Sequence, residues 1–228
     1  MNRIYNQIRK PGMQSLDPYL DLLSNRSSVF FVSIGANDGI YGDPLRTHIL
    51  RHGWHGIMVE PVPELFDALQ ENYQTSSGII FECAAIGDTS GRFPFYRVQF
   101  DQGPEWLNQL GSFDRDVIAS HKEFFPEIED YIVKMDVNCL TFADLLEKHS
   151  CQCMDVLMID TEGYDYQILR QLSLDECRPG IVIYEHKHLS PENRASLENS
   201  FSDSGYALIT LETDCIAVDP SLYSGRSD

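Results

Sequence analysis

The most constraining feature of the chain is an alternation of apolar runs and helical segments near its N-terminal end. Three short apolar runs next to glycine have the composition expected of strands buried on both faces of a sheet. They lie at residues 28–34, 56–60 and 78–85. Two helical segments separate them, at 43–52 and 63–73, and Asp43-Pro44 supplies a start signal for the first. This order predicts a parallel sheet with right-handed crossovers.

The same rhythm returns after an interruption at residues 92–139. Within the interruption, the sequence predicts an extra strand, a loop over the active site and another extended segment, at 92–100, 102–113 and 131–140. The later elements are a helix from Thr141, a strand, a helix, a strand and a helix from Ser190, followed by an antiparallel hairpin. The corresponding ranges are 141–149, 154–160, 164–172, 180–185, 190 onward, and 206–211 with 215–218. We therefore predict an α/β fold with a seven-stranded, mostly parallel sheet, helices on both faces and a C-terminal antiparallel hairpin.

Two regions are expected along the chain. Residues 1–27 form an N-terminal helical extension, whose amphipathic helix at 11–24 places Leu16, Leu20 and Leu23 on one side. Residues 28–228 form the main domain, in which 92–139 is an insertion that covers the site of the second substrate. The helix is expected to pack over the sheet or over the cofactor cleft.

Composition limits the partners that the chain can have. The 228 residues are 43% hydrophobic and 23% charged, as expected of a globular protein. The net charge of −18 disfavours nucleic acid as a partner, and the absence of clustered lysine and arginine disfavours a membrane surface. No apolar run approaches the roughly 18 residues of a membrane span, so we expect a cytosolic location. The six cysteines are interpreted as reduced core thiols.

A glycine-bounded turn follows the first predicted strand. Its residues are Gly35-Ala36-Asn37-Asp38-Gly39, and glycine there lets a ligand approach the backbone closely. The nicotinamide fingerprint needs a middle glycine, which this G-x-x-x-G spacing lacks. Asp38 would also repel a pyrophosphate. The turn therefore suits a cofactor with a cationic amino-acid end, although an ordinary structural turn remains an alternative.

Further cofactor residues are predicted at the ends of the next two strands. Glu60 ends the second strand, where an acidic side chain can accept hydrogen bonds from both ribose hydroxyl groups, and Pro61 follows it. After the third strand, Ala84 and Ala85 leave room for a flat adenine ring. A solvated acid at a strand end is the competing interpretation for Glu60.

A polar cluster is predicted at two neighbouring strand ends. Asp160 and Glu162 follow one strand, and Glu185, His186 and His188 follow the next. One of these groups could act as a general base on an acceptor hydroxyl. Alternatively, Asp160, Glu185 and His186 could hold a divalent metal ion. His121 and His149 are assigned no role.

The sequence resembles the FkbM family of methyltransferases in four segments. These are FVSIGANDG, MVEPVPELFDAL, AAIGDTSG and, most specifically, VLMIDTEGYDYQIL, which begin at residues 31, 58, 84 and 156. The resemblance implies a Rossmann-like class I methyltransferase fold and S-adenosylmethionine as methyl donor. It also implies a hydroxyl acceptor on a sugar or secondary metabolite.

The resemblance also implies roles for individual residues. Gly35, Asn37, Asp38 and Gly39 would hold the methionine end of the cofactor and Glu60 the ribose. Asp160 and Glu162 would line the cofactor and acceptor site, and Ser112 would lie near the cleft. Two alternatives stay open. One is a catalytically silent domain that binds S-adenosylmethionine or a partner protein, and the other is a nucleotide-dependent oxidoreductase on a similar fold.

Overall fold

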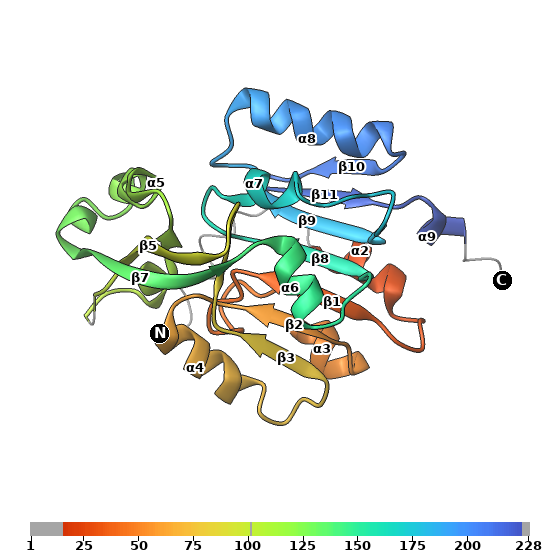
Figure 1. The fold of residues 1–228 in the computed structure, drawn as a ribbon, viewed down its shortest axis with the longest axis horizontal. Helices are drawn as coiled ribbons and strands as arrows, with labels where there is room; N and C mark the ends of the chain where they lie inside the picture. The colour runs from red at the N-terminus through yellow and green to blue at the C-terminus, as the bar shows by residue number, and fades with distance from the viewer. Residues whose placement is uncertain (1–15, 101, 225–228) are drawn as a thin grey trace.

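The computed structural model describes residues 16–100 and 102–224, and its centre is a seven-stranded sheet (Figure 1). The strand order is β10-β11-β9-β8-β1-β2-β3. The bounds are β1 (Phe30–Ile34), β2 (His55–Val59), β3 (Ile79–Glu82), β8 (Val156–Ile159), β9 (Ile181–Glu185), β10 (Ala207–Thr210) and β11 (Asp214–Val218). All neighbouring pairs from β9 to β3 are parallel, whereas β11 is antiparallel to both β9 and β10. The predicted mostly parallel sheet and terminal hairpin are confirmed.

Helices cover both faces of this sheet. One face carries α6 (Phe142–Lys148), α7 (Asp165–Leu169) and α8 (Pro191–Asp203), and the other carries α2 (Asp17–Leu20), η1 (Asp21–Leu23), α3 (Arg46–His52) and α4 (Pro63–Asn72). Successive strand side chains alternate between the faces. Val32 therefore packs with the first group and Phe31 with the second, and both are fully buried. A short helix, α9 (Ser221–Ser224), follows the last strand.

Three predicted capping residues, Thr141, Ser190 and Gly53, lie at helix ends as expected, and one, Asp43, does not. The Thr141 and Ser190 hydroxyl groups accept the amides of Asp144 and Asn193, and Gly53 ends α3 at a φ of +65°. The exception is the start of α3, which lies three residues after the predicted start at Asp43. Asp43 accepts the amide two residues later and forms a local turn instead of a helix cap.

A second sheet corrects the prediction for the middle of the chain. It has the order β4-β7-β5-β6, with β4 (Ala85–Ile86), β5 (Gly91–Val98), β6 (Gly111–Ser112) and β7 (Ile132–Leu140). The predicted third strand at 78–85 therefore ends early, because the backbone leaves the main sheet after β3 and Ala85 pairs with Cys139 of β7. In Figure 1 the long β5–β7 pair extends to one side of the main sheet.

The second sheet has a small core of its own. Short helices pack on it: η2 (Glu105–Gln109), α5 (Arg115–Ala119), η3 (Ser120–Glu123) and η4 (Ile128–Tyr131). Val98, Leu107, Ile118 and Ile128 are fully buried between them. The range 102–113, predicted as a loop, thus contains η2 and β6. Part of the insertion is held rigidly by its own apolar contacts.

The described part of the N-terminal region is helical. The first residues of the predicted helix, 11–15, lie outside the described range, and α2 with η1 forms its remainder. Leu20 and Leu23 are fully buried on the sheet face that carries α3 and α4, so this helix packs over the sheet. Within the described residues, no helix is long and apolar enough to cross a membrane.

Candidate active site

A cavity that is partly open to solvent lies at the carboxyl ends of β1, β2 and β8. Most of the predicted cofactor and acceptor residues line it. They are Gly35, Asn37, Glu60, Pro61, Ala84, Ala85, Asp160 and Glu162. Ligands of parallel α/β sheets bind outside the carboxyl ends of the strands. The two sequence features on which the cofactor prediction depended, the glycine turn and Glu60, therefore meet at one cavity.

Gly35 fits its position because a side chain there has no space. Its φ is +79°, and a Cβ atom would lie 1.8 Å from the backbone oxygen of Asp160. The amide of Asp160 donates to the Ile34 oxygen at 3.0 Å, and the amide of Gly35 donates to the Val59 oxygen at 3.0 Å. The turn is thus enclosed between the ends of β2 and β8. Only glycine leaves the backbone accessible there.

The Glu60 carboxylate holds this turn against the end of β2. It is 3% exposed, and its two oxygens accept the amides of Asn37 and Val62, each at 2.9 Å. Burial raises the pKa of Glu60 to about 7, although these hydrogen bonds oppose the shift. Each carboxylate oxygen keeps a second lone pair for a ligand hydroxyl group.

Replacement of Glu60 by glutamine tests this burial through pH. The folded protein binds a proton at Glu60 that the unfolded chain releases above its ordinary pKa of 4.5. The free energy of unfolding should therefore fall as pH rises from about 4.5 to about 7, and Glu60→Gln should remove this part of the fall. The difference between the two proteins should change by up to about 3 kcal/mol between pH 4.5 and pH 8. A constant loss adds to it, because the glutamine NH2 group cannot accept from Asn37 or Val62. Urea unfolding at several pH values measures the difference, and parallel curves would contradict the assignment.

Asp38 and Gly39 shape the turn and do not line the cavity. One Asp38 carboxylate oxygen accepts the amides of Ile40 and Tyr41 at 2.9 and 3.1 Å. A Cβ atom on Gly39 would lie 2.5 Å from the ring of Tyr73. These two members of the predicted cofactor set therefore support the backbone of the turn.

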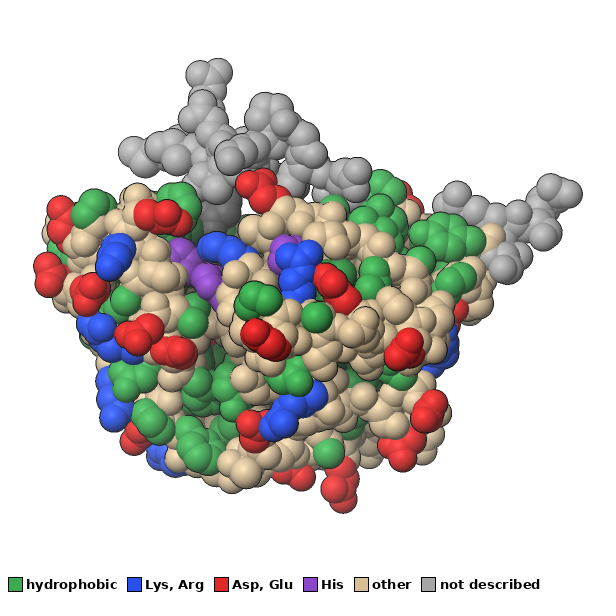
Figure 2. All heavy atoms as spheres, turned by 90° about the horizontal axis from the view of Figure 1, so that it is seen from above, with side chains coloured by type: hydrophobic (Ala, Val, Ile, Leu, Met, Phe, Trp, Pro, Cys, Tyr) green, Lys and Arg blue, Asp and Glu red, His purple; other side chains and the backbone are tan. Residues whose placement is uncertain are grey.

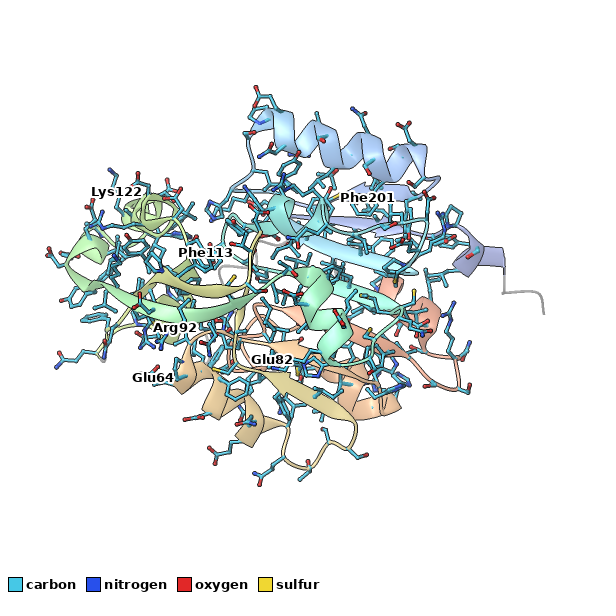
Figure 3. All side chains as sticks on the ribbon, in the orientation of Figure 1. Glu64, Glu82, Arg92, Phe113, Lys122 and Phe201 are labelled. Carbon is cyan, nitrogen blue, oxygen red and sulfur yellow. The ribbon has the colours of Figure 1, made fainter. Side chains whose placement is uncertain are left out.

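Aromatic side chains close the cavity from the side of the second sheet. Phe113 stands edge-on to Phe95, with ring centroids 5.3 Å apart, and its ring lies 5.0 Å from that of Tyr164. All three line the cavity, together with Gln109 and Gly111. Figure 3 shows Phe113 where the second sheet meets the main sheet. The insertion therefore supplies one wall of the site.

The turn after β8 presents two carboxylates to the cavity. Glu162 and Gly163 have φ angles of +48° and +96°, which turn the chain sharply after Asp160. The Ser112 hydroxyl, which is 1% exposed, donates to the Glu162 backbone oxygen at 2.8 Å and links β6 to this turn. Burial and the neighbouring acids raise the pKa of Asp160 well above its ordinary value. These two acids therefore lie close enough to influence each other's protonation.

Glu185 lies behind these two carboxylates. It does not line the cavity, and burial together with the charge of Asp160 raises its pKa to about 10. Asp165, also buried, joins the two strand ends. Its oxygens accept the Thr161 hydroxyl at 2.7 Å and the Glu185 amide at 3.0 Å.

Removal of the Asp165 carboxylate should destabilise the protein. Asp165→Ala leaves the Thr161 hydroxyl and the Glu185 amide without a buried acceptor, so we expect a loss of about 2–4 kcal/mol in unfolding free energy. Asp165→Asn keeps one acceptor oxygen and should lose less. Urea denaturation measures both variants, with the exposed Asp203→Ala as control. An Asp165→Ala protein as stable as the control would refute this role.

The structure does not bring His186 into the carboxylate group. Its ring nitrogens lie 3.2 Å from the Leu211 oxygen and 3.2 Å from the Arg194 guanidinium, away from the cavity. Side chains alternate along an extended segment, so His186 leaves β9 on the side opposite to Glu185. The chain then turns, with the Leu189 amide donating to the His186 oxygen. The metal set Asp160, Glu185 and His186 is therefore not assembled.

Two other histidines lie beside Glu162 instead: His188, which belongs to the predicted polar cluster, and His121, which was assigned no role. His188 follows the turn after β9, and its Nε2 atom is 3.2 Å from the Glu162 carboxylate. His121, from η3, has its Nε2 atom 3.9 Å from the same oxygen. The i,i+3 spacing of Glu185 and His188 was a signal for the first histidine. Nothing in the local sequence indicates the second.

The strand order and the position of the cavity define the class of protein. A sheet with this order, closed by a strand antiparallel to its neighbours and carrying its site at the glycine turn after β1, is a Rossmann-like methyltransferase fold. The family described as methyltransferase FkbM domain matches residues 33–208. The chain belongs to this family.

Several solved structures are similar to this chain. The match to methyltransferase FkbM from Methylobacillus flagellatus KT has a TM-score of 0.52 at 16% identity and covers 84% of this chain and 44% of that protein. The match to the METTL16 MTase domain has a TM-score of 0.47 at 14% identity and covers 89% of this chain and 64% of that domain. The match to the human methyltransferase 10 domain containing protein has a TM-score of 0.46 at 12% identity and covers 89% of this chain and 78% of that protein. The chain thus spans less than half of the Methylobacillus protein. No curated protein matches the sequence.

Proposed function

We propose that the protein is an S-adenosylmethionine-dependent methyltransferase that methylates a hydroxyl group of a small molecule, such as a sugar or secondary metabolite. The observation that supports it most is the convergence of the Gly35 turn and Glu60 on one cavity. S-adenosylmethionine, when bound, supplies an activated methyl group. The protein must then hold the donor, orient the acceptor and exclude water.

The residues around the cavity fit such a donor. The backbone at Gly35 and Asn37 would receive the methionine end, and the free lone pairs of Glu60 would accept the ribose hydroxyl groups. Ala84 and Ala85 would leave space for the adenine ring. Charge-assisted hydrogen bonds to a buried carboxylate contribute about 1.5–3 kcal/mol each.

Asp160 and Glu162 are proposed as the acceptor-side residues. Both line the cavity next to the aromatic wall formed by Phe113 and Tyr164. A carboxylate at this position can accept the proton of an attacking hydroxyl group, a contribution of roughly 10²–10⁴ in rate. Glu185, which lies behind them, would act through its neighbours.

Charge supports a small acceptor over a nucleic acid. Acidic residues outnumber basic ones 35 to 17. On the face shown in Figure 2, the described acidic and basic side chains are interspersed and do not form a continuous basic surface. A phosphate backbone would be repelled by this distribution. The aromatic wall instead offers apolar area to a compact acceptor.

Two measurements test the proposal. Calorimetry should detect stoichiometric binding of S-adenosylhomocysteine, and the absence of binding at millimolar concentration would refute the donor assignment. Transfer of an isotopic methyl group should then occur to a member of a panel of hydroxylated sugars and metabolites. Transfer only to an RNA arm of the panel would refute the acceptor class.

Two other outcomes would favour the alternative functions. Bound NAD in the purified protein would favour an oxidoreductase, and donor binding without transfer would favour a silent binding domain.

A further inference from the structure

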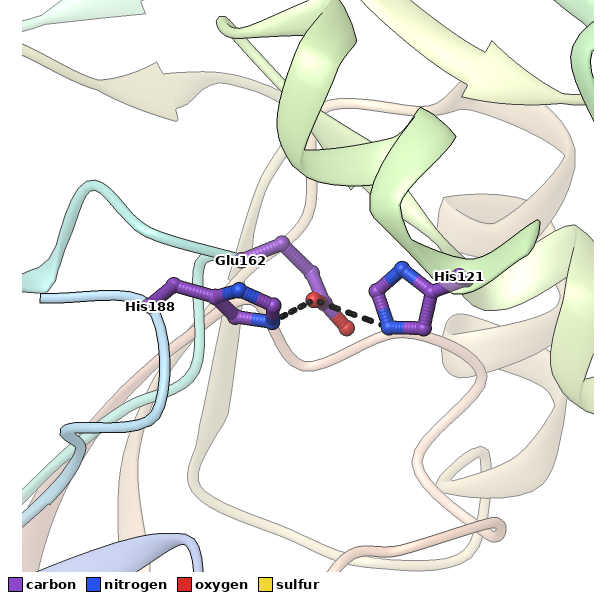
Figure 4. A group of neighbouring side chains, drawn as sticks. All are labelled: His121, Glu162 and His188. Carbon is purple, nitrogen blue, oxygen red and sulfur yellow. Dashed lines mark ion pairs between the residues drawn. The ribbon is translucent and has the colours of Figure 1, made fainter. Parts of the chain in front are cut away.

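Three side chains from distant parts of the chain meet beside the cavity. His121 comes from η3 in the insertion, Glu162 from the turn after β8 and His188 from the turn after β9 (Figure 4). We propose that these three residues bind a divalent transition-metal ion of the zinc type. This set shares no residue with the predicted metal set Asp160, Glu185 and His186, although Glu162 and His188 belong to the predicted polar cluster.

The separations of the donor atoms suit a single ion. The Oε2 atom of Glu162 lies 3.2 Å from Nε2 of His188 and 3.9 Å from Nε2 of His121, and all three ligand atoms lie within 4.8 Å of one another. Donors about 2.1 Å from a tetrahedral zinc ion are about 3.4 Å apart. One pair already has this separation, so a small approach of the His121 ring would complete the set.

Two buried atoms of the group contact each other without an aligned hydrogen bond. Glu162 Oε2 and His188 Nε2 are 3.2 Å apart, so a protonated His188 forms an ion pair with Glu162, but neither atom makes a hydrogen bond within the described residues. The His188 side chain is only 10% exposed. Buried polar atoms are nearly always hydrogen-bonded. A cation between them would satisfy both.

The His121 ring is already oriented for metal binding. Its Nδ1 atom lies 3.2 Å from the Val117 oxygen and 3.3 Å from the Ile118 oxygen. Because carbonyl oxygens only accept, Nδ1 carries a proton. Burial lowers the pKa of His121 and favours the neutral ring, in which Nε2 keeps its lone pair. A backbone carbonyl that accepts from the second ring nitrogen is the usual support of a metal-binding histidine.

A second carboxyl group lies near the other histidine. Glu185 Oε2 is 3.7 Å from His188 Nε2, and this oxygen also lacks a hydrogen-bond partner within the described residues. Glu185 therefore brings a further oxygen close to the nitrogen that would bind the ion.

The ammonium group of Lys187 competes with a metal ion for the Nε2 atom of His121. Its Nζ atom lies 3.5 Å from Nε2 of His121, so the ammonium group can donate to that nitrogen. Lys187 is exposed, which lets its flexible side chain turn into solvent when an ion binds. Removal of Lys187 should therefore strengthen metal binding, because it removes a competing positive charge beside the donor atoms.

The donor set also indicates the class of ion. Two imidazole rings and one carboxylate suit zinc, cobalt or iron, whereas magnesium and calcium prefer sets made of oxygen alone. Three protein ligands leave at least one position open for water or another oxygen ligand. Because Glu162 also lines the cavity, the ion would adjoin the acceptor side of the site.

Metal titration of the full chain tests the site without any methyl donor. After treatment with a chelator, the protein should bind one equivalent of Co²⁺ with a visible absorption spectrum, and Zn²⁺ should displace it. His188→Ala and Glu162→Gln should each weaken binding at least tenfold, and Lys187→Ala should strengthen it. Circular dichroism checks that each variant is folded. His149→Ala is the matched control, since His149 also contacts a carboxylate, that of Glu82, but lies outside the site.

Three results would overturn the proposal. They are the absence of stoichiometric Co²⁺ binding, equal affinity in the His188→Ala and wild-type proteins, and loss of binding in Lys187→Ala. Co²⁺ bound by the exposed thiol of Cys153 would give thiolate charge-transfer bands. A Cys153→Ser variant removes this binding and leaves only binding at the proposed site. The readout involves neither S-adenosylmethionine nor turnover. Failure here leaves the proposed methyltransferase function intact, and failure of donor binding leaves the metal result intact.

Discussion

Gly35→Ala should weaken S-adenosylhomocysteine binding at least a hundredfold. The new Cβ atom would lie 1.8 Å from the Asp160 backbone oxygen, and the left-handed φ of +79° disfavours any side chain. The backbone oxygen belongs to the turn that also carries Glu162, so relief of the clash must move the turn or the end of β1. Either movement changes the cavity wall. Isothermal titration calorimetry measures the affinity.

Gly42→Ala is a matched control for this substitution. Gly42 has a similar φ of +70°, but a Cβ atom there meets nothing within 4 Å. The control should lose only the roughly 1–3 kcal/mol of backbone strain in stability and keep its cofactor affinity. If Gly35→Ala bound the cofactor as tightly as Gly42→Ala, the close approach at the end of β1 would have no role in binding.

Glu162→Gln should lower turnover by roughly 10²–10⁴ while cofactor affinity changes less than severalfold. The amide keeps the size of the side chain but removes the negative charge beside the cavity. Steady-state rates of isotopic methyl transfer and calorimetry with S-adenosylhomocysteine measure the two effects separately. Glu129→Gln, an exposed acid of the insertion paired with Arg115, is the control. Unchanged turnover in Glu162→Gln would remove Glu162 from the chemistry.

The main sheet was predictable because its signals are local. Short apolar runs next to glycine, together with capping residues such as Thr141 and Ser190, indicate each element within its own segment. The parallel order then follows from the handedness of crossovers. The second sheet was not predictable in this way. Its long β5–β7 pair joins residues about forty positions apart, and β4 leaves the main sheet only because β7 offers a partner.

The same distinction applies to the candidate site. Gly35, Glu60 and Asp160 were predictable because each ends a strand, and strand topology brings those ends together. The choice between His186 and His188 depended on a turn whose geometry the residue types do not determine. His121 reaches the site only through the packing of the insertion, so no pattern around it in the sequence could indicate a function.

The hydrogen bond from Ser112 to Glu162 has a consequence for how this protein and its relatives can diversify. It joins the inserted sheet to the turn after β8 at a backbone atom, so the hydrogen bond does not depend on which side chain follows Asp160 and Thr161. We therefore expect that the residues of the aromatic wall can change while the position of the inserted sheet is preserved. Under the proposed function, the inserted sheet would contribute to acceptor selectivity and the main sheet would hold the donor, and one buried hydroxyl group joins the two sheets.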